Sequence, residues 1–161
     1  RSGNTHPNLA PYEVFACEDG HFILATGNDN QFRKFCAVIG REELADDPAF
    51  ATNSARVANR VALHDHMVEG LADRNREDVL AALEKAHVPA SPINDIGQTF
   101  ADPQAVARGM RLNLQDDLGN TLPSVRSPIV LSQTPLTYAR PSPRLGEHTD
   151  EILAELEQKK S

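Results

Sequence analysis

The sequence has few cysteines and no long apolar run. Its two cysteines, Cys17 and Cys36, lie 19 residues apart without Cys-x-x-Cys spacing, which argues against a disulfide scaffold, a zinc ribbon or a redox dithiol. Apolar neighbours on both sides predict that both thiols are buried. His64 and His66 are two residues apart, which places them on different sides of a helix. We therefore expect no metal site, and no stretch is long enough to predict a membrane span.

Basic residues are scarcer than acidic ones. Lysine and arginine number 16 against 23 aspartates and glutamates, which gives a net charge of −7. Nucleic acids and anionic membranes bind concentrated basic surfaces, so neither is an expected partner. Tryptophan is absent, but 161 residues with 40% hydrophobic side chains suffice for a core without disulfides. The first residues lack the pattern of a signal peptide, and we expect a cytoplasmic location.

The chain also lacks the common catalytic motifs. It contains no Gly-x-Ser-x-Gly, no glycine-rich phosphate loop, no His-Glu-x-x-His and no cysteine with an evident histidine base. The adjacent acids Asp46-Asp47 and Asp116-Asp117 are typical of solvated turns, since neighbours in sequence point apart. Taken alone, the residues therefore offer few catalytic constellations.

The first third of the chain predicts a β-hairpin followed by a helix. Residues 11–18 alternate polar and apolar, residues 21–26 are mostly apolar, and Asp19-Gly20 between them favours a type I′ turn. Gly27-Asn28 then forms a polar corner before a helix that ends at Gly40. Such a corner between strand and helix is a frequent binding position, and helix capping is the alternative role for these residues.

The middle of the chain predicts two amphipathic helices. Apolar residues recur at helical spacing from Thr52 to Leu71, and a polar break at residues 73–76 precedes a second helix that Pro89 ends. We expect an antiparallel helix pair packed on the hairpin. A further helical turn is expected within residues 94–100, and a short helix follows Asp102-Pro103.

After Gly109 the pattern changes again. Residues 110–115 and 121–125 predict a second hairpin, and the proline-rich residues 126–146 predict an extended arm before a C-terminal helix. The expected fold is thus α+β, with a β-hairpin packed with an antiparallel helix pair, then a second hairpin and an extended arm ending in a helix. An arm of this length is unusual inside a compact domain and implies a partner surface.

The segment near the N-terminus is the best candidate for a ligand site. Glycine at position 3 permits close backbone approach, Pro7 fixes a turn, and the intervening side chains of Asn4, Thr5 and His6 can form hydrogen bonds, as can Asn8. A terminal loop without function is the alternative.

Several groups of residues also occur in the order and spacing of one known family. They are Gly3-Asn4-Thr5-His6-Pro7, Ala10-Pro11-Tyr12, Asp19-Gly20, Gly27-Asn28-Asp29-x-Gln31-Phe32, Asp47-Pro48-x-Phe50-x-Thr52-Asn53-x-x-Arg56-x-x-Asn59-Arg60, Val88-Pro89-x-x-Pro92-Ile93-Asn94, Asp102-Pro103-Gln104, Ala107-Arg108-Gly109-Met110 and Leu145-Gly146-Glu147-His148-Thr149. The chain resembles the family III CoA-transferases over nearly its whole length, and the dicarboxylate-type transferases most.

The resemblance implies that this chain is a C-terminal piece of an enzyme that transfers CoA between carboxylic acids. In the family a catalytic aspartate, which forms the acyl-enzyme intermediates, precedes the segment matched by residues 3–7, so this piece should be inactive alone. Residues 1–108 correspond to the small domain and residues 109–161 to an arm returning to the large domain. The first residue, Arg1 rather than Met, agrees with that expectation. An interlocked homodimer, acyl-CoA and carboxylic acid substrates, and no tightly bound cofactor are implied.

The resemblance also implies a substrate-binding role for one loop. Residues 5–8 match a glycine-rich loop of formyl-CoA transferase that closes over the intermediates, but this chain has no glycine run there and its loop should be stiffer. The expected substrate-binding residues are Asn4, Thr5, His6, Pro7, Asn8, Gly27 and Asn28. Two alternatives remain open at this point, an acyl-CoA racemase of the same family and a non-catalytic interaction module.

Overall fold

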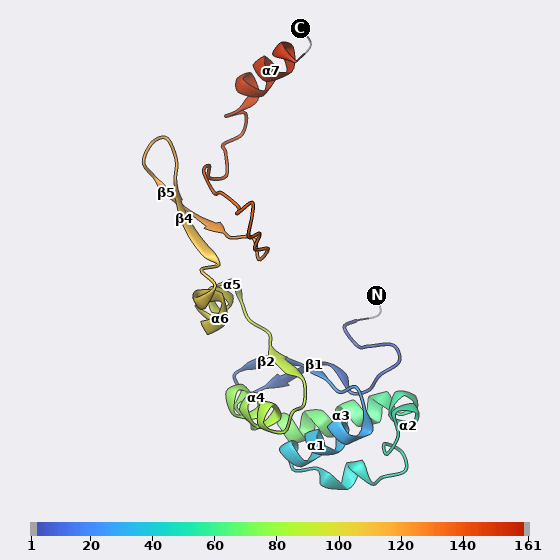
Figure 1. Ribbon diagram of the computed structural model, residues 1–161. Helices are drawn as coiled ribbons and strands as arrows, with labels where there is room; N and C mark the ends of the chain where they lie inside the picture. The colour runs from blue at the N-terminus through green and yellow to red at the C-terminus, as the bar shows by residue number, and fades with distance from the viewer. Residues whose placement is uncertain (1–2, 160–161) are drawn as a thin grey trace. The chain divides into compact units, whose positions relative to one another are not determined.

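The structure is a computed structural model, described here for residues 3–159 (Figure 1). The chain forms two compact units, which divide between Ile93 and Asn94. The sequence had suggested a division after residue 108, and the assignment of the two parts to a small domain and a returning arm stays a prediction.

The first unit contains a three-stranded antiparallel sheet in the order β1-β2-β3. The predicted hairpin is confirmed as β1 (Tyr12–Cys17) and β2 (Gly20–Ala25). The third strand, β3 (Ala90–Pro92), was not predicted, because three residues that end in a proline carry no alternating pattern.

The predicted type I′ turn of this hairpin is wrong. Cys17 pairs with Gly20, so Glu18 and Asp19 form the two-residue loop, and neither has the positive φ that such a turn requires. Asp19 is instead held by contacts distant in sequence. Its carboxylate accepts from the backbone N of Arg76 at 2.7 Å and from the Asn75 amide at 3.1 Å.

The helices cover one face of the sheet, as Figure 1 shows. Helix α1 (Asp29–Ile39) contacts both α3 (Arg60–Leu71) and α4 (Arg76–Lys85), while α3 also contacts β1 and α4 contacts β2 and β3. The helical pattern from Thr52 is divided at Asn59 into α2 (Asn53–Ala58) and α3. A 3-10 turn, η1, spans Glu42–Ala45.

Capping residues explain where the helices begin and end. Asn28 caps α1, whose last turn is closed by Gly40 in the left-handed conformation at φ 72°. Asn75 caps α4 through the backbone N of Glu77 and of Asp78. Pro89 does not end α4 as predicted, since the helix stops at Lys85 and the left-handed residue His87, at φ 57°, turns the chain first.

The core of the first unit lies between the sheet and the helices. It consists of apolar side chains from β1, β2, α1, α3, α4 and the loops between them, namely Ala10, Phe15, Phe22, Leu24, Phe32, Phe35, Cys36, Ile39, Leu44, Ala45, Phe50, Leu63, Met67, Leu71, Val79, Leu83 and Val88. Burial raises the pKa of Cys36 to about 12. Cys17 is only half-buried, so the prediction of two buried thiols is right for Cys36 alone.

The second unit has the predicted elements. Two short helices, α5 (Ile96–Ala101) and α6 (Pro103–Ala107), precede the hairpin of β4 (Arg111–Gln115) and β5 (Thr121–Val125). An arm without helix or strand leads from there to α7 (Thr149–Gln158), drawn in red in Figure 1. Within residues 3–159, no helix is long and apolar enough to cross a membrane.

Candidate functional site

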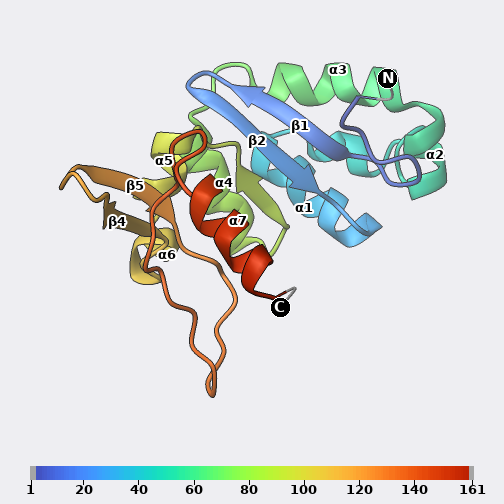
Figure 2. The same ribbon diagram turned by 90° about the horizontal axis from the view of Figure 1, so that it is seen from above.

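The two predicted site segments, residues 4–8 and 27–28, flank the same end of the β1-β2 hairpin. Tyr12 at the start of β1 pairs with Ala25 at the end of β2, which brings the residues before the first strand beside those after the second. The residues that flank the two segments are in contact, because both the hydroxyl and the backbone N of Thr26 donate to the Pro11 carbonyl. Residues 3–11 are called the N-terminal loop below, and Figure 2 shows its course from another side.

His6 organises the N-terminal loop. Its backbone N donates to the Tyr12 carbonyl at 2.9 Å, and its ring stacks on Tyr12 with centroids 5.1 Å apart. Its Nδ1 accepts from the backbone N of Asn8 and of Leu9, both at 3.1 Å. Since Nδ1 is the acceptor, the neutral ring carries its proton on Nε2. Within the described residues Nε2 has no partner, so it is a free donor.

Two polar side chains of the following helices fix the loop from outside. The Asn53 amide donates to the Asn8 carbonyl at 2.9 Å and accepts from the backbone N of Ala10 at 3.2 Å. The Arg60 guanidinium donates to the carbonyls of His6 at 2.7 Å and of Pro7 at 3.2 Å. The N-terminal loop is therefore bonded to α2 and α3, and the expectation that it is stiffer than a glycine-rich loop stays a prediction.

Arg56 anchors the loop to the core and to α1. Its side chain is 1% exposed, which is unusual for an arginine and requires that its donors be satisfied. Nε donates to the Ala10 carbonyl at 2.6 Å, one Nη to the Phe50 carbonyl at 2.9 Å and the other to Asp29 Oδ1 at 2.7 Å. The guanidinium also lies 4.4 Å from the centre of the Phe32 ring.

The corner at Gly27-Asn28 serves the helix that follows. Asn28 Oδ1 accepts from the backbone N of Gln31 at 2.9 Å, and Gly27 N donates to the Gln31 side chain at 2.7 Å. Capping, the alternative role, is thus what these contacts perform, while a role in substrate binding stays a prediction. Asn4 is exposed, and its Oδ1 lies 3.5 Å from the backbone N of Val14.

Sequence reasoning missed the residues that hold this loop. Asn53, Arg56 and Arg60 belong to a motif that was recognised, but no role was assigned to them. Their spacing of three and four residues was the available signal, because it places side chains on one helical face. Glu13 was also missed. It is 7% exposed, and its carboxylate lies 3.1 Å from Nδ1 of His64, which stacks on Phe15.

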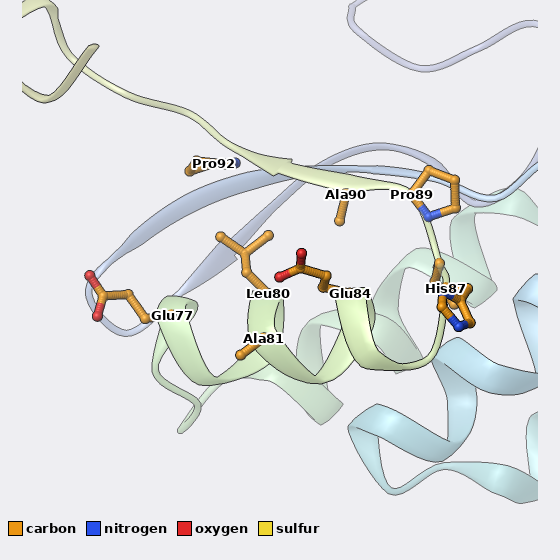
Figure 3. Close-up of a pocket in the computed structure, with 9 residues that line it drawn as sticks. Glu77, Leu80, Ala81, Glu84, His87, Pro89, Ala90 and Pro92 are labelled. Carbon is orange, nitrogen blue, oxygen red and sulfur yellow. The ribbon is translucent and has the colours of Figure 1, made fainter. Parts of the chain in front are cut away.

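A concavity of about 690 Å³ lies elsewhere in the first unit, between α4 and residues 87–92. In Figure 3, Leu80 and Glu84 rise from α4 toward the strand segment that holds Ala90. Its apolar floor is flanked by the acidic Glu77 and Glu84, which disfavour anionic ligands such as carboxylates. No predicted site residue lines it, so the N-terminal loop remains the candidate site.

A solved structure and a family model show the protein family to which the chain belongs. The chain superposes on the crystal structure of a CAIB/BAIF family protein from Brucella suis with a TM-score of 0.79 and 49% identity, covering 97% of this chain and 40% of that one. The model of CoA-transferase family III matches residues 1–149. The chain therefore belongs to CoA-transferase family III, as its motifs predicted.

Curated relatives show which CoA-transferases the chain resembles in sequence. The chain is 52% identical over 157 residues to the succinate–glutarate CoA-transferase of Agrobacterium fabrum, and 33% identical to the succinyl-CoA:glutarate CoA-transferase of Homo sapiens. These alignments cover 98% and 97% of this chain but 39% and 36% of the relatives. The chain thus spans about two-fifths of the length of the curated relatives it matches.

Proposed function

We propose that this chain is part of a CoA-transferase that moves CoA between dicarboxylic acids, with succinate and glutarate as the acyl groups. The observation that carries the proposal is the 52% identity, over 98% of the chain, to a succinate–glutarate CoA-transferase. In such an exchange the CoA sulfur leaves the succinyl carbonyl and ends on the glutaryl carbonyl, while one carboxylate oxygen passes the other way.

We propose further that the N-terminal loop contacts the acyl carboxylate. Four of its backbone carbonyls are bonded to side chains of α2 and α3. The loop is therefore left with hydrogen-bond donors, above all Nε2 of His6, and donors suit a carboxylate. Of the other predicted residues, Asn4, Thr5, Pro7 and Asn8 share this segment with His6, whereas Gly27 and Asn28 follow β2.

A fixed loop also serves the chemistry of the intermediates. Acyl anhydrides and thioesters react with water, so an enzyme that forms them gains by covering them with a segment that does not open freely. The catalytic aspartate is expected outside residues 1–161. The nucleophile is therefore proposed to come from another part of the polypeptide, and this chain alone is proposed to be inactive.

The test uses the complete polypeptide that contains this chain. With succinyl-CoA and glutarate, we expect glutaryl-CoA to form, as followed by liquid chromatography, and residues 1–161 alone to give none. Absence of any CoA transfer among four- and five-carbon dicarboxylates would contradict the proposal. Deuterium uptake at the α carbon of a 2-methylacyl-CoA would indicate the racemase instead. The homodimer, the cytoplasmic location and the lack of a tightly bound cofactor stay predictions.

A further inference from the structure

A single run of helical side chains binds nearly every carbonyl of the turn that contains His6. Asn53, Arg56 and Arg60 follow one another at intervals of three and four residues across α2 and the start of α3. Between them they donate to the carbonyls of His6, Pro7, Asn8 and Ala10. The negative ends of these peptide dipoles are thereby paired with cations and an amide of the same protein.

Arg60 makes the two contacts nearest to the candidate donor. One guanidinium binds the consecutive carbonyls of His6 and Pro7, at 2.7 Å and 3.2 Å, and so fixes the orientation of both peptide units. The next two backbone N–H groups, of Asn8 and Leu9, close on Nδ1 of His6. Holding these carbonyls therefore holds the turn that sets the direction of the imidazole and leaves its Nε2–H free.

We propose that Arg60 is a positioning residue for the acyl-carboxylate site, acting through the backbone of His6 and Pro7 on the His6 ring. The inference rests on the proposed function of the N-terminal loop. An arginine suits this task because its planar fork reaches two neighbouring acceptors at once, whereas a lysine is a point charge that cannot fix both peptide units. Arg60→Lys should therefore behave as a loss of function.

Arg60 can be tested without removing a core residue. Its side chain is half-buried, unlike that of Arg56, so its loss should leave the first unit folded. Arg74 offers a matched control. It is also half-buried, and its guanidinium likewise donates to two carbonyls, of Gly70 and Val38, each at 2.9 Å and both outside the N-terminal loop.

The first measurement is steady-state transfer by the complete polypeptide. In Arg60→Ala and Arg60→Lys we expect kcat/KM for the acceptor carboxylate to fall by about 10- to 100-fold, the range for a misplaced binding group. We also expect the ratio of acyl-CoA hydrolysis to transfer to rise, because a loosened loop admits water. Arg74→Ala should change neither quantity. Equal behaviour of the Arg60 and Arg74 variants would overturn the inference.

The second measurement does not depend on activity. Hydrogen exchange of the Asn8 and Leu9 amides should quicken by about tenfold or more in Arg60→Ala, since local opening becomes easier. The Gln31 amide, bonded to Asn28, should keep its rate. If the wild type transfers no CoA, the proposed function fails, while faster exchange at Asn8 and Leu9 still supports the positioning role. Unchanged exchange at both amides would overturn it.

Discussion

The two units differ in how far they bury their apolar side chains. Within residues 3–159 every buried residue lies in the first unit. The second unit exposes large apolar side chains along its whole length, namely Ile96, Val106, Leu118, Val125, Ile129, Val130, Leu131, Leu136, Leu145, Ile152, Leu153 and Leu156. Exposed apolar surface of this extent is typical of regions that contact another protein surface. We infer that the first unit contains its own core and that the second is stabilised by contacts it does not itself supply.

Local polar bonds give the second unit its shape instead. The Asp116 carboxylate accepts from the backbone N of Leu118 and of Asn120, and Arg140 pairs with Glu151 through two bonds of 2.9 and 3.2 Å. Bonds of this kind in exposed positions each contribute little to the free energy of unfolding, because water competes for the same groups. They can specify a turn without making the unit stable.

Separating the units should give the largest effect. Residues 1–93 alone are expected to unfold in one cooperative thermal transition, because their core is complete. Residues 94–161 alone are expected to show no such transition, by calorimetry and by near-ultraviolet circular dichroism. A cooperative transition in residues 94–161 would contradict the conclusion that the second unit has no core of its own.

Matched truncations inside the two units should differ next. Phe35 is fully buried, and Phe35→Ala is expected to lower the free energy of unfolding by about 3–5 kcal/mol through lost burial and a residual cavity. Leu153 is 53% exposed, and Leu153→Ala should change it by less than about 0.5 kcal/mol. Urea unfolding of the 161-residue chain measures both. Similar losses in the two variants would show that the second unit shares the core.

Arg56 should give an intermediate effect. Arg56→Met keeps much of the side-chain volume but leaves the carbonyls of Ala10 and Phe50 without their donor. Each buried acceptor left unpaired costs about 1–3 kcal/mol, so we expect a total loss of about 2–6 kcal/mol in urea unfolding. Arg33→Met, which removes an exposed pair with Asp46, is the control and should be near neutral. Equal losses of unfolding free energy in the two variants would show that the buried Arg56 stabilises the fold no more than the exposed Arg33.

The sequence predicted what depends on neighbours in the chain. Both hairpins and the capping role of Asn28 follow from residues within a few positions of each other. The failures involve distant partners. The turn at Glu18-Asp19 is set by Asp19 bonding to α4, 57 residues away, and β3 exists only as a partner of β2.

The same contrast between near and distant partners holds for the candidate site. The N-terminal loop was predicted because its hydrogen-bonding side chains are adjacent in sequence. The residues that hold it were missed, because Asn53, Arg56 and Arg60 bind carbonyls 45 to 54 positions earlier in the chain. Their helical spacing was a signal that the prediction did not use, and only the fold shows that their side chains bind the N-terminal loop.

Titration of Asp116 should give the smallest effect. It tests whether local hydrogen bonds, rather than a packed core, hold the turn of the second hairpin. The side chain of Asn120 donates to this carboxylate, and with backbone donors it lowers the pKa of Asp116 below its ordinary 3.8. The ionised form is thus favoured in the folded turn. Its contribution is present above the ordinary pKa and is lost as the pH falls through the lowered value. We expect the Leu118 and Asn120 amide signals to shift toward unstructured positions below about pH 4.

Asp116→Asn tests this account of the turn. The variant should show the low-pH amide signals at neutral pH and lose their pH dependence, because its neutral amide is a weaker acceptor than the carboxylate. Asp117→Asn, a change of the same kind one residue away, should keep the wild-type titration. If Asp117→Asn abolished the titration as well, general charge rather than the bonds to Asp116 would order the turn. If the second unit instead had a hidden core, the hairpin signals would not move even at about pH 2, since packing would hold the turn without its carboxylate.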